Sequence, residues 1–251
     1  MFRSFVYLDV DKMYTYLKQI DKEFSSRPFE VNTKRAIGGN IGISSIGLSA
    51  EREIEEKRSY SRDPFNDYDK FEKDLESLEA SEFFDFVLSS EYDLKILPKM
   101  CLFRYNGRFE IPEQFDMYSI AQIFMPMIAN QIPTSSDNEK GLIEAFLGNA
   151  SADIPFIVED EEVTISGKLN TDYLLEAYSE LEEYNEQDVF MLCKVIGLMN
   201  REKVEVFNPL KDFVRLPRAA RREMGDSVND GFDIIYADGP VLKVEVIAIY
   251  K

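Results

Sequence analysis

Hydrophobic positions near the start of the chain follow a strand pattern and then a helix pattern. Residues 5–9 form a short apolar run of β-prone side chains, which predicts a strand. A helix is expected directly after it, because Met13, Leu17 and Ile20 recur at helical spacing behind an aspartate that can cap the first turn. Residues 66–80 predict a second amphipathic helix, since their apolar side chains recur every three or four positions.

A tight hairpin is predicted in the middle of the chain. Two apolar segments within residues 101–111 flank Asn106-Gly107, and this dipeptide favours the positive φ angles of a type I′ turn. Helices are expected after the hairpin, over residues 113–130 and 137–147, because apolar side chains again recur at helical spacing there.

Strands dominate the pattern beyond residue 150. Short β-prone runs predict strands at 156–158, 163–166, 189–198, 204–207 and 241–249. An acidic helix is expected over residues 171–184, and Asp238-Gly239 predicts a turn that joins 234–236 to the last strand in a hairpin. The predicted fold class is therefore α+β, with mixed or antiparallel sheets and packed helices, and with two sub-domains as an option.

The expected domain boundary lies near residue 150, where the linker-like sequence Asn-Ala-Ser-Ala-Asp occupies 149–153. Residues 1–150 are predicted to form an N-terminal α+β domain, and residues 151–251 a C-terminal α+β domain that ends in the hairpin. The N-terminal domain contains a glycine-rich segment, residues 25–62. This segment is expected to be partly flexible, because glycines alternate with β-branched side chains there.

Composition narrows the chemistry that is open to the chain. Its 251 residues include 29 lysines and arginines against 47 aspartates and glutamates, a net charge of −18. The absence of histidine excludes a Ser-His-Asp relay and a histidine-ligated zinc site. Cys101 and Cys193 stand in apolar runs and are expected to be buried small hydrophobes. No apolar run reaches the ~20 residues that span a bilayer, and no signal peptide is visible, so we expect a cytoplasmic protein without membrane contact.

Two aspartates after the first strand offer a candidate metal site. A strand that ends in Asp9-x-Asp11 and leads into an aromatic-bearing helix resembles the metal-binding strand of palm-type polymerases and nucleotidyl cyclases. In this alternative, Asp9 and Asp11 are catalytic and hold Mg²⁺, with Glu110 as third ligand if the predicted hairpin lies beside the first strand. The simpler interpretation is that Asp9 or Asp11 caps the following helix. We adopt it, and it leaves the protein without catalytic residues, metal or cofactor.

A second candidate site is basic. Arg218, Arg221 and Arg222 share one face of a predicted helix that follows Pro217, and Arg215 precedes them. Such a face can bind phosphate, RNA or an acidic partner. The alternative is a solvated face that pairs with the acidic helix of the same chain. Because the net charge is strongly negative, nucleic-acid binding is expected only locally, at this arginine face.

The order of several short motifs resembles an uncharacterised bacterial family of domains of unknown function. The motifs are Tyr7-Leu8-Asp9 followed by Tyr16 and Gln19, the Gly/Ser-rich stretch 38–50, Phe71 to Leu75, Lys194 to Gly197, Gly239-Pro240 and Ile247 to Tyr250. This resemblance implies no established activity and no catalytic residues. Similar proteins occur near mobile elements and phage-conflict genes, so the resemblance implies a role in phage defence or its evasion.

We therefore expect a soluble bacterial or phage protein that acts by binding another protein or a ligand. Its expected role is that of an accessory or regulatory component of a phage-defence or counter-defence system. The identity of the partner is left open, as is a homo-oligomer built through exposed strands. The alternative function is a Mg²⁺-dependent phosphoryl- or nucleotidyl-transfer enzyme that uses Asp9 and Asp11.

Overall fold

The computed structural model describes residues 3–21, 24, 31–35, 56–60, 63–79, 81–89, 93–115, 153–176, 181–208 and 234–251. Contacts divide the chain into two compact units, which we call the barrel unit (Met1–Lys12 with Leu78–Lys251) and the helical unit (Met13–Ser77). This division differs from the expected boundary near residue 150, because a strand that precedes that point pairs with strands that follow it.

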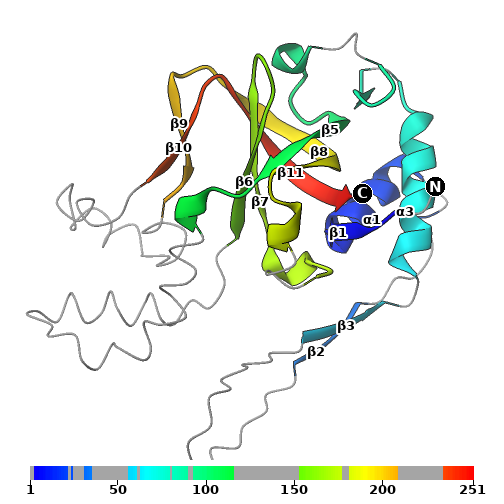
Figure 1. Cartoon of the computed structure of the whole chain (residues 1–251). Helices are drawn as coiled ribbons and strands as arrows, with labels where there is room; N and C mark the ends of the chain where they lie inside the picture. Colours follow the sequence, from blue (N-terminus) through cyan, green and yellow to red (C-terminus); the bar gives the residue numbers. More distant parts are fainter. Residues whose placement is uncertain are drawn as a thin grey trace, which may run out of the picture. The chain divides into compact units, whose positions relative to one another are not determined.

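The barrel unit is built on one sheet that closes on itself (Figure 1). Its strands are β1 (Phe5–Leu8), β4 (Phe83–Asp85), β5 (Leu102–Glu110), β6 (Ile154–Glu159), β7 (Thr164–Leu169), β8 (Gln187–Met199) and β11 (Val241–Tyr250). The order β5-β6-β7-β11-β8 returns to β5 and forms a five-stranded barrel, in which only β7 and β11 run parallel. β1 pairs with the end of β11, and β4 pairs with β5, so these two strands extend the sheet.

The barrel interior is filled by side chains that alternate inward along the strands. Phe109 on β5 stacks on Phe156 on β6, with ring centroids 5.6 Å apart. Gly167 on β7 faces the same ring, because a Cβ at this position would lie 2.7 Å from it. Other fully buried members of this core include Ile165, Met191, Cys193, Leu242 and Val246. The positions between them on the same strands form the outer face of the barrel.

A separate hairpin, β9 (Lys203–Phe207) with β10 (Ile235–Asp238), lies between β8 and β11 in the sequence. Val204, Val206 and Ala237 pack with Val241, and Ile157 of β6 borders this small apolar cluster. The predicted hairpin between 234–236 and the last strand is therefore wrong. β10 pairs with β9, while β11 is occupied by β8 on one side and by β7 and β1 on the other.

The helical unit contains most of α1 (Val10–Ile20), all of α3 (Pro64–Glu76) and the antiparallel pair β2 (Val31–Arg35) and β3 (Glu56–Tyr60). Asp63 caps α3 by accepting a hydrogen bond from the backbone of Phe65. The Tyr14 hydroxyl on α1 donates a 2.7 Å hydrogen bond to Asp67 on α3. Both helices confirm the predictions from helical spacing, and the first strand, β1, confirms the prediction over residues 5–9.

The predicted fold class is wrong for the described residues. They form mainly strands with a closed barrel, where an α+β fold with packed helices was expected. Within the acidic helix expected over 171–184, 3₁₀ turns are described at Thr171–Tyr173 and Glu182–Tyr184 and Leu181 is helical, while residues 177–180 lie outside the described residues. The helix expected over 113–130 begins as predicted, because residues 113–115 are helical, and the rest of it lies outside the described residues, as do the helix expected over 137–147 and most of the glycine-rich segment. No helix in the described ranges is long and apolar enough to cross a membrane.

The predicted hairpin at Asn106-Gly107 is also wrong, because β5 runs straight through this dipeptide. Each residue from Leu102 to Phe109 has a partner on β8, and this long ladder outweighs the local turn preference. The glycine serves close packing, since a Cβ at Gly107 would lie 2.5 Å from the Tyr105 ring and 2.8 Å from Val158.

Candidate functional site

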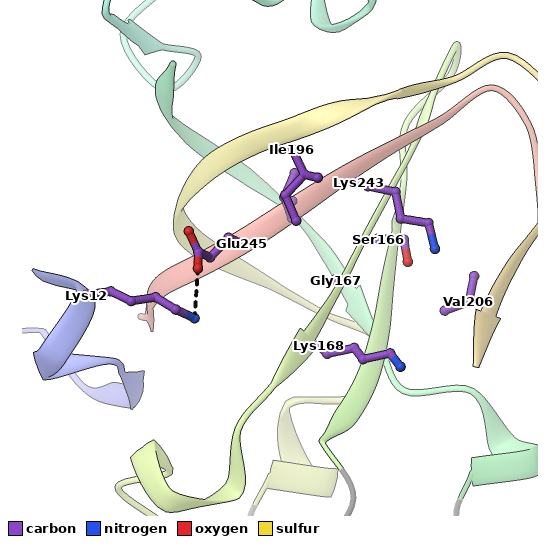
Figure 2. Close-up of a pocket in the computed structure, with 9 residues that line it drawn as sticks. Lys12, Ser166, Gly167, Lys168, Ile196, Val206, Lys243 and Glu245 are labelled. Atoms are coloured by element: carbon purple, nitrogen blue, oxygen red, sulfur yellow. Dashed lines mark ion pairs between the residues drawn. The ribbon is translucent and has the colours of Figure 1, made fainter. Parts of the chain in front are cut away.

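A hollow of about 270 Å³ opens on the outer face of the barrel unit. It lies where the neighbours of β11 change: β7 pairs with β11 as far as Lys243, and β1 pairs with it from Ala248. Residues 244–247 of β11 lie between these two pairings. The hollow is lined by Lys12, Ser166, Gly167, Lys168, Ile196, Val206, Lys243, Val244 and Glu245 (Figure 2). We call it the lysine hollow.

Three lysines reach the hollow from three different elements. Lys168 on β7 and Lys243 on β11 occupy outward positions, because Ile165, Leu169, Leu242 and Val244 of the same strands belong to the core. Ser166 pairs with Lys243 in the parallel register, so its side chain lies next to Lys243. In Figure 2, the ends of Lys168 and Lys243 extend away from the Lys12–Glu245 pair, toward Val206.

Lys12 forms the side of the hollow next to β1. Its ammonium lies 2.9 Å from a carboxylate oxygen of Asp9 and 3.5 Å from one of Glu245. The other oxygen of Asp9 accepts a 3.0 Å hydrogen bond from the backbone N–H of Lys12, so Asp9 caps the first turn of α1. Burial raises the pKa of the Asp9 carboxyl above its usual value, and its bonds to Lys12 offset part of that shift. Lys12 is thus held by two carboxylates.

The β9–β10 hairpin forms the opposite wall. Lys243 donates a 2.6 Å hydrogen bond to the backbone carbonyl of Glu205, and Val206 lines the hollow beside it. An ammonium carries three N–H donors, so this bond does not prevent Lys243 from binding a second acceptor. Lys168 and Lys243 thus place two cationic side chains on this side of the hollow, next to Ser166, which is 2% exposed.

This arrangement suits an anionic group rather than a cation or a covalent reaction. Two ammonium groups and a hydroxyl can bind a carboxylate or phosphate through charge-assisted hydrogen bonds. Ser166 has no histidine to act as its base, because the chain contains none. Both cysteines are buried, as predicted, and burial raises the pKa of Cys101 to about 11 and also raises that of Cys193. A buried thiol of raised pKa is a poor nucleophile at neutral pH.

Comparison with known families places the chain. The family model described as domain of unknown function DUF6414 matches residues 2–250. The chain belongs to the DUF6414 family. This confirms the resemblance to an uncharacterised domain-of-unknown-function family. No curated protein and no solved structure matches the chain.

The aspartates singled out in the sequence lie at the start of α1 in this DUF6414 domain. Asp9 is 2% exposed and is engaged with Lys12, and Asp11 accepts a hydrogen bond from the Tyr173 hydroxyl. Glu110 ends β5, where burial and the nearby acids Glu159 and Glu186 raise its pKa. Within the described residues, no three acidic or cysteine side chains lie close enough together to hold a metal ion, so Glu110 does not join the two aspartates there.

The other sequence candidates fall outside the part of the DUF6414 domain that the structure describes. The segment between β9 and β10 that lies outside the described residues contains all four arginines, Arg215, Arg218, Arg221 and Arg222. The lysine hollow was missed, because its lysines are single residues at alternate strand positions rather than a run of charge. The signal that marks them is a polar outward position inside an apolar strand, as at Ser166, Lys168 and Lys243.

Proposed function

We propose that the protein acts by binding, without catalytic turnover, and that the lysine hollow holds an anionic group of a partner protein. The observation that carries this proposal is the placement of Lys168, Lys243 and Ser166 together on the outer face of a barrel whose chain has a net charge of −18. Basic side chains gathered in one place on an acidic protein create a local positive field that attracts anions. An acidic partner is therefore repelled less at this place than at the rest of the surface.

The architecture supports the position of this site. Five-stranded Greek-key barrels of the OB type carry their ligands on the face of the second and third strands and on adjoining loops. In the present barrel, β6 and β7 hold those places, and β7 supplies Ser166 and Lys168 to the hollow. An architecture does not fix a ligand, so this analogy bears only on where binding occurs.

The enzyme alternative gains no support from the geometry of the described residues. Asp9 is buried, caps a helix and pairs with Lys12, all of which are structural roles. A metal-dependent transferase needs carboxylates that are open to the ion and to a substrate phosphate. The proposed setting of the binding activity is the one that family resemblance implies, a phage-defence or counter-defence system, with this protein as an accessory or regulatory component.

A photo-crosslinking amino acid placed at position 196 tests the proposal in cells that carry the gene naturally. Ile196 lines the hollow and is 55% exposed, so the substitution is expected to leave the fold intact. The matched control carries the crosslinker at Leu88, an exposed apolar residue beyond β4. We expect a discrete crosslinked protein from position 196 and none of that mass from position 88.

The Lys168→Glu/Lys243→Glu double variant decides whether the lysines matter. With the crosslinker still at position 196, the adduct should fall at least tenfold, while Lys203→Glu on β9 should leave it unchanged. The proposal fails if the adduct survives the double charge reversal, or if positions 196 and 88 capture the same proteins. The same double variant should also lose any protection that the wild-type protein confers in a phage-plating assay.

A further inference from the structure

Three aromatic side chains lie in one row across three neighbouring strands of the barrel unit. The strand registers align Phe5 on β1 with Tyr250 on β11, and Tyr250 with Phe190 on β8. The centroid of the Tyr250 ring lies 5.4 Å from that of Phe5 and 5.6 Å from that of Phe190. Val189 and Met191, on either side of Phe190, belong to the core. Because side chains alternate along a strand, the aromatic row belongs to the outer face.

The aromatic row already holds one guanidinium group. Cζ of Arg3 lies 5.1 Å from the centroid of the Tyr250 ring, a distance at which the face of a ring attracts a cation. With Arg3 over it and a ring on each side, Tyr250 is only 4% exposed. Phe190, at the β8 end of the row, is half-buried, and Tyr250 is its one ring partner in the described part of the chain.

Two exposed polar side chains lie next to Phe190 on the same face. Asn106 is directly opposite it on β5, and its amide donates a 3.2 Å hydrogen bond to a backbone carbonyl of β8, which leaves the amide oxygen as an acceptor. Asp188 lies two residues before Phe190 on β8. Its carboxylate makes no hydrogen bond or ion pair with any described residue, since Arg108, opposite it in the register, is bound at 2.7 Å to Glu186.

We propose that Phe190, Asp188 and Asn106 form a site for an arginine side chain of a partner protein. The guanidinium stacks on the face of the Phe190 ring that is turned from Tyr250, as Arg3 stacks on Tyr250 itself. Two of its N–H groups donate to the Asp188 carboxylate, and a further N–H donates to the Asn106 amide oxygen. A guanidinium suits all three groups at once, because it is planar, weakly hydrated and carries five N–H donors.

Charge favours the same occupant. A net charge of −18 attracts a basic segment, and the unpaired Asp188 carboxylate offers it a partner. A lysine ammonium fits less well, because it is strongly hydrated and can neither stack on a ring nor form a bidentate pair. The lysine hollow is lined by none of these three residues, so this site is a second one, and it selects a group of opposite charge.

A nucleotide fits the site less well than an arginine. Nucleobases also stack on aromatic rings, and an asparagine amide can pair with adenine. Proteins that bind single strands, however, combine such rings with a basic groove for the phosphates. Here the neighbouring charge is the Asp188 carboxylate, and Arg108 is already paired with Glu186. Phosphates would therefore be repelled both by the site and by the net charge of the protein.

The test measures binding of the full chain to two fluorescent 12-residue peptides by anisotropy, one a repeat of Gly-Ser-Arg and the other of Gly-Ser-Lys. The two peptides carry equal charge, so general attraction to an acidic protein cancels in the ratio of their dissociation constants. The site variants are Phe190→Leu and Asp188→Asn. Phe65→Leu and Glu161→Gln are the matched controls, because they remove an exposed ring and an exposed carboxylate elsewhere. A deoxyadenosine 12-mer is the nucleic-acid probe.

We expect the wild type to bind the arginine peptide about fivefold more tightly than the lysine peptide. This preference should disappear with Phe190→Leu and with Asp188→Asn, and should persist in both controls. Asp188→Asn decides the question if the loss of the ring disturbs folding, since Asp188 is exposed. Equal affinity of the wild type for the two peptides, or a preference that survives Asp188→Asn, overturns the inference. Tighter binding of the deoxyadenosine 12-mer than of the arginine peptide also overturns it.

Discussion

The inner and outer faces of the barrel are made by the same strands but hold different kinds of residue. Inside, Phe156, Gly167 and Val244 are closely packed, since a Cβ at Gly167 would lie 2.7 Å from the Phe156 ring and 3.0 Å from the Val244 carbonyl oxygen. Outside, Ser166 and Lys243 alternate with these residues and border a hollow. We therefore expect the inner face to determine stability, and we propose the outer face for recognition, although neighbouring positions in the sequence alternate between the two faces.

This contrast means that a substitution and its neighbour in sequence should report on different properties. A change at an inward position should alter the free energy of unfolding, because the interior is close-packed. A change at an outward position should alter binding and leave unfolding nearly unchanged, because solvated side chains contribute little to stability.

The largest expected effect on stability belongs to Phe156→Ala. This ring is fully buried, stacks on Phe109 and fills the space left by Gly167. Its removal should lower the free energy of unfolding by about 3 to 5 kcal/mol, measured by urea denaturation. Ile157→Ala, at the adjacent outward position, is the control and should cost clearly less. Equal losses for the two variants would show that the faces are not energetically distinct.

Two glycines on the two faces give a sharper comparison. A Cβ at Gly167 would lie 2.7 Å from the Phe156 ring and 3.0 Å from the Val244 carbonyl oxygen, so Gly167→Ala should cost about 1 to 3 kcal/mol. A Cβ at Gly197 would meet only the flexible side chain of Lys99, and Gly197→Ala should change stability by less than about 0.5 kcal/mol.

The double variant Gly167→Ala/Phe156→Leu identifies the cause of the first loss. If the methyl group and the ring compete for one space, the double variant should lose less stability than the sum of the two single-variant losses. The difference should be at least about 0.5 kcal/mol. Strict additivity, or a Gly197→Ala variant as unstable as Gly167→Ala, would contradict the packing argument.

Local elements could be predicted from the sequence where one periodicity was long and unopposed. β1, α1, α3, β8 and β9 all match their predictions within a few residues. The continuous strand β5 could not be predicted, because Asn106-Gly107 has a strong turn preference that is overcome only by pairing with β8, some 80 positions away. The fold class failed for the same reason: closure of the barrel depends on which strands pair, and residue spacing does not encode that.

The candidate site could not be predicted from the sequence for a related reason. Lys12, Lys168 and Lys243 are separated by more than 70 positions each, and only the pairing of β7 with β11 brings the last two together. In contrast, the cap at Asp9 is a local interaction, and the structure places Asp9 at the start of α1, where the helix-cap interpretation had it. Interactions between residues close in the sequence could be predicted from it, while a site formed by the pairing of distant strands could not.

The smallest expected effect concerns Asp9, which lies between the two faces because its carboxylate is buried while its partner Lys12 reaches the hollow. The cap itself contributes about 1 kcal/mol, so Asp9→Ala/Asp11→Ala should lower the melting temperature. An unchanged melting temperature together with lost function would instead favour the enzyme alternative. The pH dependence gives a second, independent measurement of the same residue.

Asp9→Asn keeps a cap acceptor and removes the titration. Because burial raises the pKa of Asp9 in the folded chain, the folded state holds the proton more tightly than the unfolded state. The contribution of Asp9 to stability is therefore complete below its ordinary pKa and is lost as the pH rises through the raised value. The free energy of unfolding of the wild type minus that of Asp9→Asn should fall as the pH rises from below the ordinary aspartate pKa through the raised one, as measured by urea denaturation. A difference that increases with pH would mean that the Lys12 ion pair outweighs burial, and that Asp9 belongs with the charged outer face.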